Sequence, residues 1–77
     1  MFETFRLLKL EYKEYIILMK SGSFYCVFDE DAIIINKIFN YKINQLKNNL
    51  KAGFPVSLIE KNINILKKKD KLYSCRR

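Results

Sequence analysis

The sequence contains no histidine. This absence removes the side chain that most often acts as a general base near neutral pH and as a metal ligand. Catalysis would then need paired carboxylates or an activated lysine or cysteine, and the chain groups none of these persuasively. A small nuclease, the enzyme class that we considered, needs a carboxylate cluster or metal-ligand spacing, and neither is present. We therefore expect a protein that is not an enzyme and has no catalytic residue, metal or cofactor.

Cysteine is also scarce, because Cys26 and Cys75 are the only two. Two thiols without histidine do not make a convincing zinc site. In a reducing cytoplasm we expect both to be buried and unbridged. If their strands lie in one sheet, the pair could be close, and the sequence leaves that open.

Long hydrophobic runs are absent. The longest apolar run extends from Tyr15 to Met19, far short of the ~20 residues that a membrane span needs. The N-terminus carries Glu3 and has no apolar segment followed by a cleavage site, so no signal peptide is indicated. We expect a cytoplasmic protein without membrane contact.

Acidic side chains are few in the second half of the chain. Residues 42–77 hold ten basic and two acidic side chains (net +8), whereas residues 1–41 hold five basic and six acidic ones (net −1). This asymmetry indicates one face that attracts polyanions such as nucleic acid. Charge alone favours a simpler alternative, in which the lysines keep a small protein soluble.

The length of 77 residues allows one small domain, and we treat residues 1–77 as that single domain. A hydrophobic fraction of 49% and an aromatic fraction of 14% are ample for a packed core, so the chain is not of a disordered type. A domain of this size buries only roughly 60–65% of the surface of its unfolded chain, and its stability should be marginal.

Hydrophobic periodicity and turn residues predict an α+β fold. The predicted elements are a helix over 2–14, a strand over 15–20, a turn at 21–23, a strand over 24–28, a helix over 29–40, a weak strand over 41–46, a mobile loop at 47–51, an extended segment over 52–56, a helix over 57–69 and a strand over 71–75. This order, α-β-β-α-β-(β)-α-β, predicts helices packed on a small mixed β-sheet.

Particular residues mark the boundaries of these elements. Asp29 is a good N-cap for the second helix, and Asn40 is a plausible end for it. Gly22 can take the positive φ of a hairpin turn. Pro55 biases the residue before it toward an extended conformation. The stretch Ser57-Leu58-Ile59-Glu60 fits a capping box, which predicts a helix start.

A set of colinear motifs carries a family resemblance. The motifs are Leu8-Lys9, the hydrophobic strand over 15–19, Gly22-Ser23-Phe24-Tyr25-Cys26-Val27-Phe28, Glu30-Asp31-Ala32, Ala52-Gly53-Phe54-Pro55 and Leu72-Tyr73-Ser74-Cys75. In this order they resemble domain I of MutS, the mismatch-sensing protein. That family shows a Leu-Lys stretch, a hydrophobic strand, G-D-F-Y-E-x-F, acidic-Asp-Ala, A-G-x-P-Y-H and a strand ending V-A-I-C. The similarity covers nearly the whole chain, with a shortened middle loop, and implies a MutS domain I-like fold.

The resemblance also implies a site. In the family, the phenylalanine of the F-x-E motif wedges into the duplex and stacks on a mispaired base, and the glutamate hydrogen-bonds that base. Strand positions i and i+2 share a face, and a mismatched step is easier to unstack and kink. Carried over, Phe24 is the wedge and Cys26 stands in place of the glutamate. Ser23 replaces the family aspartate, and Val56-Ser57 replaces Tyr-His.

The predicted DNA-binding motif is therefore Phe24-Tyr25-Cys26, presented by the turn residues Gly22 and Ser23. The alternative for Phe24 is an ordinary core residue, as we expect for Tyr25, Val27 and Phe28. Contacts to the phosphate backbone are expected from Lys20, Lys47 and Lys51. The basic residues Lys67, Lys68, Lys69, Lys71, Arg76 and Arg77 are further candidates, or simply a solvated helix end.

The resemblance implies a DNA-binding module that keeps the wedge but has lost the base-reading carboxylate. Its partners would be double-stranded or mismatched DNA and a repair protein. The alternative is a protein-interaction module that retains the fold but not mismatch reading. The 77 residues contain no G-x-x-x-x-G-K-[ST] phosphate loop. We therefore expect a module without the connector, lever, clamp and ATPase domains with which MutS signals repair.

Overall fold

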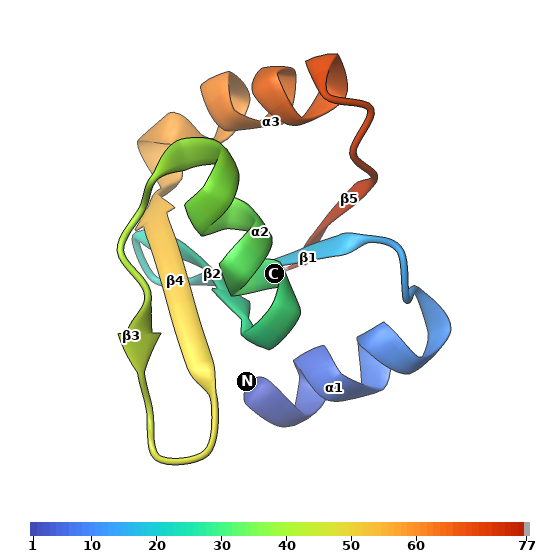
Figure 1. The fold of residues 1–77 in the computed structure, drawn as a ribbon, viewed down its shortest axis with the longest axis vertical. Helices are drawn as coiled ribbons and strands as arrows, with labels where there is room; N and C mark the ends of the chain where they lie inside the picture. The colour runs from blue at the N-terminus through green and yellow to red at the C-terminus, as the bar shows by residue number, and fades with distance from the viewer. Residues whose placement is uncertain (77) are drawn as a thin grey trace.

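A five-stranded mixed sheet with strand order β3-β4-β2-β1-β5 forms the centre of the computed structural model, which describes residues 1–76 (Figure 1). The elements are α1 (Phe2–Glu11), β1 (Ile16–Ser21), β2 (Phe24–Phe28), α2 (Asp29–Phe39), β3 (Asn44–Gln45), β4 (Leu50–Pro55), the 3₁₀ helix η1 (Val56–Leu58), α3 (Ile59–Lys68) and β5 (Tyr73–Arg76). The predicted α+β class is confirmed. None of the helices over residues 1–76 is both long and apolar enough to cross a membrane.

Strand β1 lies between its hairpin partner and the last strand. It pairs antiparallel with β2 and parallel with β5, while β2 pairs antiparallel with β4. The two cysteines lie on either side of β1, because Cys26 is opposite Met19 and Cys75 is opposite Leu18. Both are free. Cys26 is buried as expected, but the expectation of burial is wrong for Cys75, which lies exposed on the edge strand.

The sheet buries a core on each face, because alternate residues of a strand point to opposite sides. Helix α1 covers one face, where Phe5 packs with four strand residues, Ile17, Met19, Cys26 and Phe28. Helices α2 and α3 contribute to the core on the other face. That larger core contains Ile16, Leu18, Tyr25, Val27, Ala32, Ile35, Ala52, Phe54 and Leu66.

Helix starts differ from the sequence prediction. Phe28, not Asp29, is the N-cap of α2 and makes no side-chain cap bond. Asp29 has a φ of 48°, and its carboxylate accepts the Leu50 N–H at 3.0 Å, which ties α2 to β4. The capping box at Ser57 is also wrong, because η1 occupies this segment and α3 begins after it without a side-chain cap. Asn40 does end α2, in the left-handed conformation.

Two other boundaries differ from the sequence prediction. Helix α1 ends at Glu11 rather than at residue 14, and the backbone carbonyls of Lys13 and Tyr15 accept hydrogen bonds from the Lys9 ammonium. The segment expected to be a loop at 47–51 is shorter, since β4 begins at Leu50 and Lys51 pairs with Phe28.

Candidate nucleic-acid interface

Phe24 is the first residue of β2 and follows the turn at Gly22, which has a φ of 60°. Its side chain is 51% exposed, whereas Cys26 and Phe28, on the same strand face, are 5% and 4% exposed. The Phe28 ring lies under α1, with its centroid 5.6 Å from that of Phe2 and 5.4 Å from that of Phe5. Helix α1 thus covers one end of this face of β2 and leaves the ring at the turn uncovered.

A hollow of about 360 Å³ lies beside Phe24 on the same face of the sheet. Antiparallel pairing brings Gly53 opposite Cys26 and Lys51 opposite Phe28, and directly opposite residues share a sheet face. The hollow is lined by Ser21, Phe24, Cys26, Asn44, Lys51, Ala52 and Gly53. Cys26 is buried and is one of the residues that line this hollow.

The residues of the predicted motif do not all lie on one face of the sheet. The Tyr25 side chain points to the opposite face, where it is buried and stacks on Phe54 with a centroid distance of 5.9 Å. The turn residues Gly22 and Ser23 are both exposed. The Ser23 carbonyl accepts the Val56 N–H at 2.9 Å, which links the turn to the end of β4.

The three candidate lysines are placed separately. Lys51 is half-buried on the face of Phe24 and lines the hollow. Lys20 is paired with Tyr25, so its exposed side chain leaves β1 from the opposite face. Lys47 is exposed in the bend between β3 and β4. The structure therefore brings only Lys51 together with Phe24.

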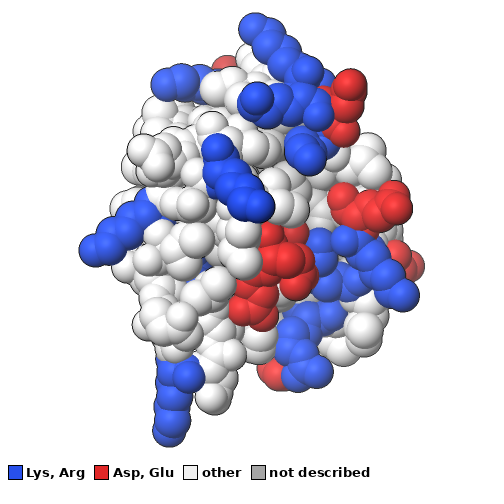
Figure 2. Space-filling view, viewed as in Figure 1, with Lys and Arg blue, Asp and Glu red and all other residues white. Residues whose placement is uncertain are grey.

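The basic C-terminal residues form a different surface. Blue side chains gather at the top of Figure 2, where Figure 1 places α3, whereas a group of red ones lies near the middle. The basic residues Lys67, Lys68, Lys69 and Lys71 are all exposed. The Arg76 guanidinium lies 5.3 Å from the centre of the Tyr12 ring, in a cation–π contact. Arg77 lies outside the described residues.

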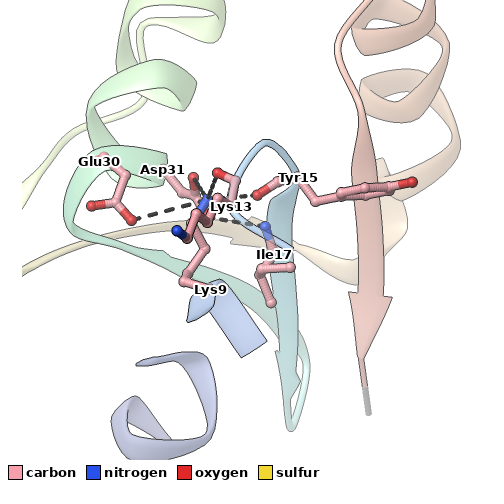
Figure 3. A network of polar contacts seen from close by, with 6 residues as sticks. All are labelled: Lys9, Lys13, Tyr15, Ile17, Glu30 and Asp31. Atoms are coloured by element: carbon pink, nitrogen blue, oxygen red, sulfur yellow. Dashed lines mark hydrogen bonds and ion pairs between the residues drawn. The ribbon is translucent and has the colours of Figure 1, made fainter. Parts of the chain in front are cut away.

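A buried ion pair joins α1 to α2 and β1 (Figure 3). The Lys9 ammonium lies 3.0 Å from Asp31 Oδ1 and donates to the backbone carbonyls of Tyr15 at 2.7 Å and Lys13 at 3.1 Å. The other Asp31 oxygen accepts the Ile17 N–H at 3.0 Å. The network therefore fixes the position of α1 on the sheet and the end of that helix.

The Asp31 carboxyl lies in a low-polarity environment. Burial raises its pKa above the ordinary value, while the hydrogen bonds from Ile17 and Lys9 act against this rise. Sequence reasoning placed both residues in the motifs but predicted no contact between Lys9 and Asp31. The signal was present: Asp31 precedes Ile35 by one helical turn, so a carboxylate stands on the apolar stripe and requires a buried partner. Among residues 1–76, no three His, Cys, Asp or Glu side chains are grouped so that they could hold a metal ion.

Comparison with known families gives a match over almost the whole chain. The family model for MutS domain I matches residues 1–75. The chain belongs to the MutS domain I family. In this family member, the Leu-Lys and acidic-Asp-Ala motifs supply the buried ion pair, and the strand that follows Gly22 supplies the exposed ring.

Full-length MutS proteins are similar over this domain alone. The chain is 39% identical over 61 residues to the DNA mismatch repair protein MutS of Thermosipho melanesiensis, which is 79% of this chain and 7% of that protein. It is 33% identical over 66 residues to MutS of Ehrlichia chaffeensis, covering 86% of this chain and 8% of the relative. With MutS of Thermotoga maritima the identity is 36% over 53 residues, covering 69% and 7%. The chain thus spans less than a tenth of the length of these relatives.

Proposed function

We propose that this MutS domain I-like chain is a DNA-binding domain that contacts DNA through the exposed ring of Phe24. The observation that carries the proposal is the 51% exposure of Phe24, which stands at the position of the phenylalanine in the family's F-x-E motif. Cys26 and Phe28, on the same strand face, are buried. Full burial of a phenylalanine side chain contributes about 1.5–3 kcal/mol. A half-exposed ring thus leaves roughly 1 kcal/mol to be gained when a base stacks on it.

The position of the family glutamate holds the thiol of Cys26. This side chain is buried, and a thiol is only a weak hydrogen-bond partner. It does not supply the carboxylate that would read a mispaired base. Binding should therefore show little preference for mismatched over matched duplexes.

Contacts to phosphates are proposed for Lys51, which shares the face of Phe24, and for Lys47 in the adjoining bend. Such contacts are nonspecific, and each lowers log K by about 0.9 per tenfold rise in salt for duplex DNA. A domain with so few contacts should bind weakly and release DNA as salt rises.

Substitution of Phe24 by alanine tests the stacking role. We expect the affinity for a duplex to fall by roughly 5- to 100-fold, because loss of an aromatic stack costs about 1–3 kcal/mol. Fluorescence anisotropy of a labelled duplex at low salt, matched and with one mismatch, measures this change. Leu72→Ala is a control, since Leu72 is 48% exposed but does not line the hollow beside Phe24. Equal affinity of the two variants for DNA would show that Phe24 does not contact DNA.

A second function, protein interaction, is favoured by a different surface. Leu7 and Leu10 on α1 are 65% and 71% exposed, which is high for large apolar side chains on one helix. We expect nuclease-treated samples to retain binding to full-length MutS from the same cell, and the double substitution Leu7→Ser and Leu10→Ser to abolish it. Loss of the complex on nuclease treatment alone would show that nucleic acid bridged the two proteins.

A further inference from the structure

The hollow beside Phe24 exists because α1 covers only part of its sheet face. Phe5 of the helix packs with Ile17, Met19, Cys26 and Phe28, and no residue of α1 lines the hollow. Gly53 has no side chain to fill this space, and an added Cβ would lie 2.7 Å from the Tyr25 carbonyl oxygen. Close pairing of β2 and β4 therefore requires glycine here and keeps the depression open. Its volume of about 360 Å³ falls in the range of small-molecule sites, about 300–1,000 Å³.

The chemistry of the hollow changes along the strands. At one end lie the paired residues Phe24 and Ser21, and at the other lie the paired residues Asn44 and Lys51. The register separates Phe24 from Lys51 by four residues, roughly 13 Å along the strands. An apolar stacking surface is thus followed by hydrogen-bonding groups and then by a cation.

Charge in the hollow is positive. Of the described residues that line it, Lys51 is the only basic one, and none is an aspartate or a glutamate. A glutamate at position 26, which the family pattern has, would place a carboxylate beside Lys51 and repel a phosphate. The thiol removes this repulsion.

We propose that this hollow binds single-stranded DNA, with an unpaired base stacked on Phe24 and a neighbouring phosphate at Lys51. Sheet-based domains hold single strands by combining an exposed aromatic ring on an open sheet face with a cation on the same face. Asn44 both donates and accepts hydrogen bonds, so it suits a base edge or a sugar. A single strand offers its bases to the ring without the unstacking that a base of a duplex needs first. This inference rests on the proposed DNA contact of Phe24 and adds a ligand to it.

The test compares charge reversals at two lysines. Lys51→Glu should lower the affinity for a labelled oligothymidine strand by roughly tenfold or more and reduce its salt slope by about 0.7. Its affinity for the same strand should fall by more than Lys37→Glu lowers it. Lys37 is an exposed residue of α2, on the other side of the sheet, and its substitution gives the same change in net charge.

A second variant keeps the test independent of Lys51. Cys26→Glu introduces the carboxylate of the family pattern and should also weaken strand binding, whereas Cys26→Ser should not. Circular dichroism establishes that both variants fold. Strand affinity unaffected by Lys51→Glu and by a folded Cys26→Glu overturns the inference. Duplex binding that depends on Phe24, without any binding of the single strand, also overturns the inference. In that case the proposed contact between Phe24 and DNA still holds. If neither strand nor duplex binds, the proposed function fails as well.

Discussion

Replacing Phe28 by alanine is expected to lower the free energy of unfolding by about 3–5 kcal/mol, whereas Phe24→Ala should lower it by less than about 1 kcal/mol. Both rings lie on one face of β2, four residues apart, so backbone and residue type are matched. Phe28 is 4% exposed and Phe24 is 51% exposed, because Phe2 and Phe5 of α1 pack against the ring of Phe28 and not against that of Phe24.

Urea unfolding followed by circular dichroism measures the two losses. A domain of this size has a total stability of only about 4–12 kcal/mol, so Phe28→Leu serves as a milder variant, with an expected loss below about 1.5 kcal/mol. Losses of equal size at Phe24 and Phe28 would mean that the Phe24 ring contributes to the core. The stacking surface proposed for DNA would then not exist.

The contrast between these two rings shows what local patterns predict. The strand over Phe24–Phe28 and the turn at Gly22 were both predicted correctly, because alternation and glycine act over a few residues. The sequence left open whether Phe24 is core or protrudes. That outcome depends on where α1 ends over the sheet, a contact between residues distant in the chain.

The errors have the same physical origin. Asp29 was expected to cap its own helix, but its carboxylate accepts a hydrogen bond from the N–H of Leu50, which is distant in sequence. Cys75 was expected to be buried, but β5 is the edge strand, and edge position follows from pairing that a single sequence does not display. Lys20 is close to Phe24 along the chain, but it pairs with Tyr25, and the side chains of this pair lie on the opposite face of the sheet from Phe24.

The family motifs are therefore divided between two tasks in this chain. The strand after Gly22 presents a ring at the surface, and Lys9 with Asp31 holds the helix that covers the rest of the same face. Removal of the ion pair should thus affect DNA binding only through folding. Removal of the ring should affect binding without affecting folding.

Replacing Lys9 by methionine is expected to lower the free energy of unfolding by about 3–5 kcal/mol at pH 7, because it leaves the buried Asp31 carboxylate without its cation. The matched control is Lys13→Met, since Lys13 is an exposed lysine next to the end of the same helix and makes none of the ion pairs found in residues 1–76. Its substitution should change stability by less than about 0.5 kcal/mol.

The loss in Lys9→Met should also depend on pH. Burial already raises the pKa of Asp31, and without the Lys9 ammonium the pKa of this carboxyl should rise further. Between the unfolded pKa, near 3.8, and the raised folded one, the native state binds more protons than the unfolded state, so stability rises as pH falls through this window. Urea unfolding of Lys9→Met at pH 7 and at about pH 5 should therefore show part of the loss recovered at the lower pH. Adding Asp31→Asn to Lys9→Met removes the titrating group and should abolish that recovery. A loss in Lys9→Met that is the same at both pH values would mean that Asp31 is not the buried charge that Lys9 neutralises.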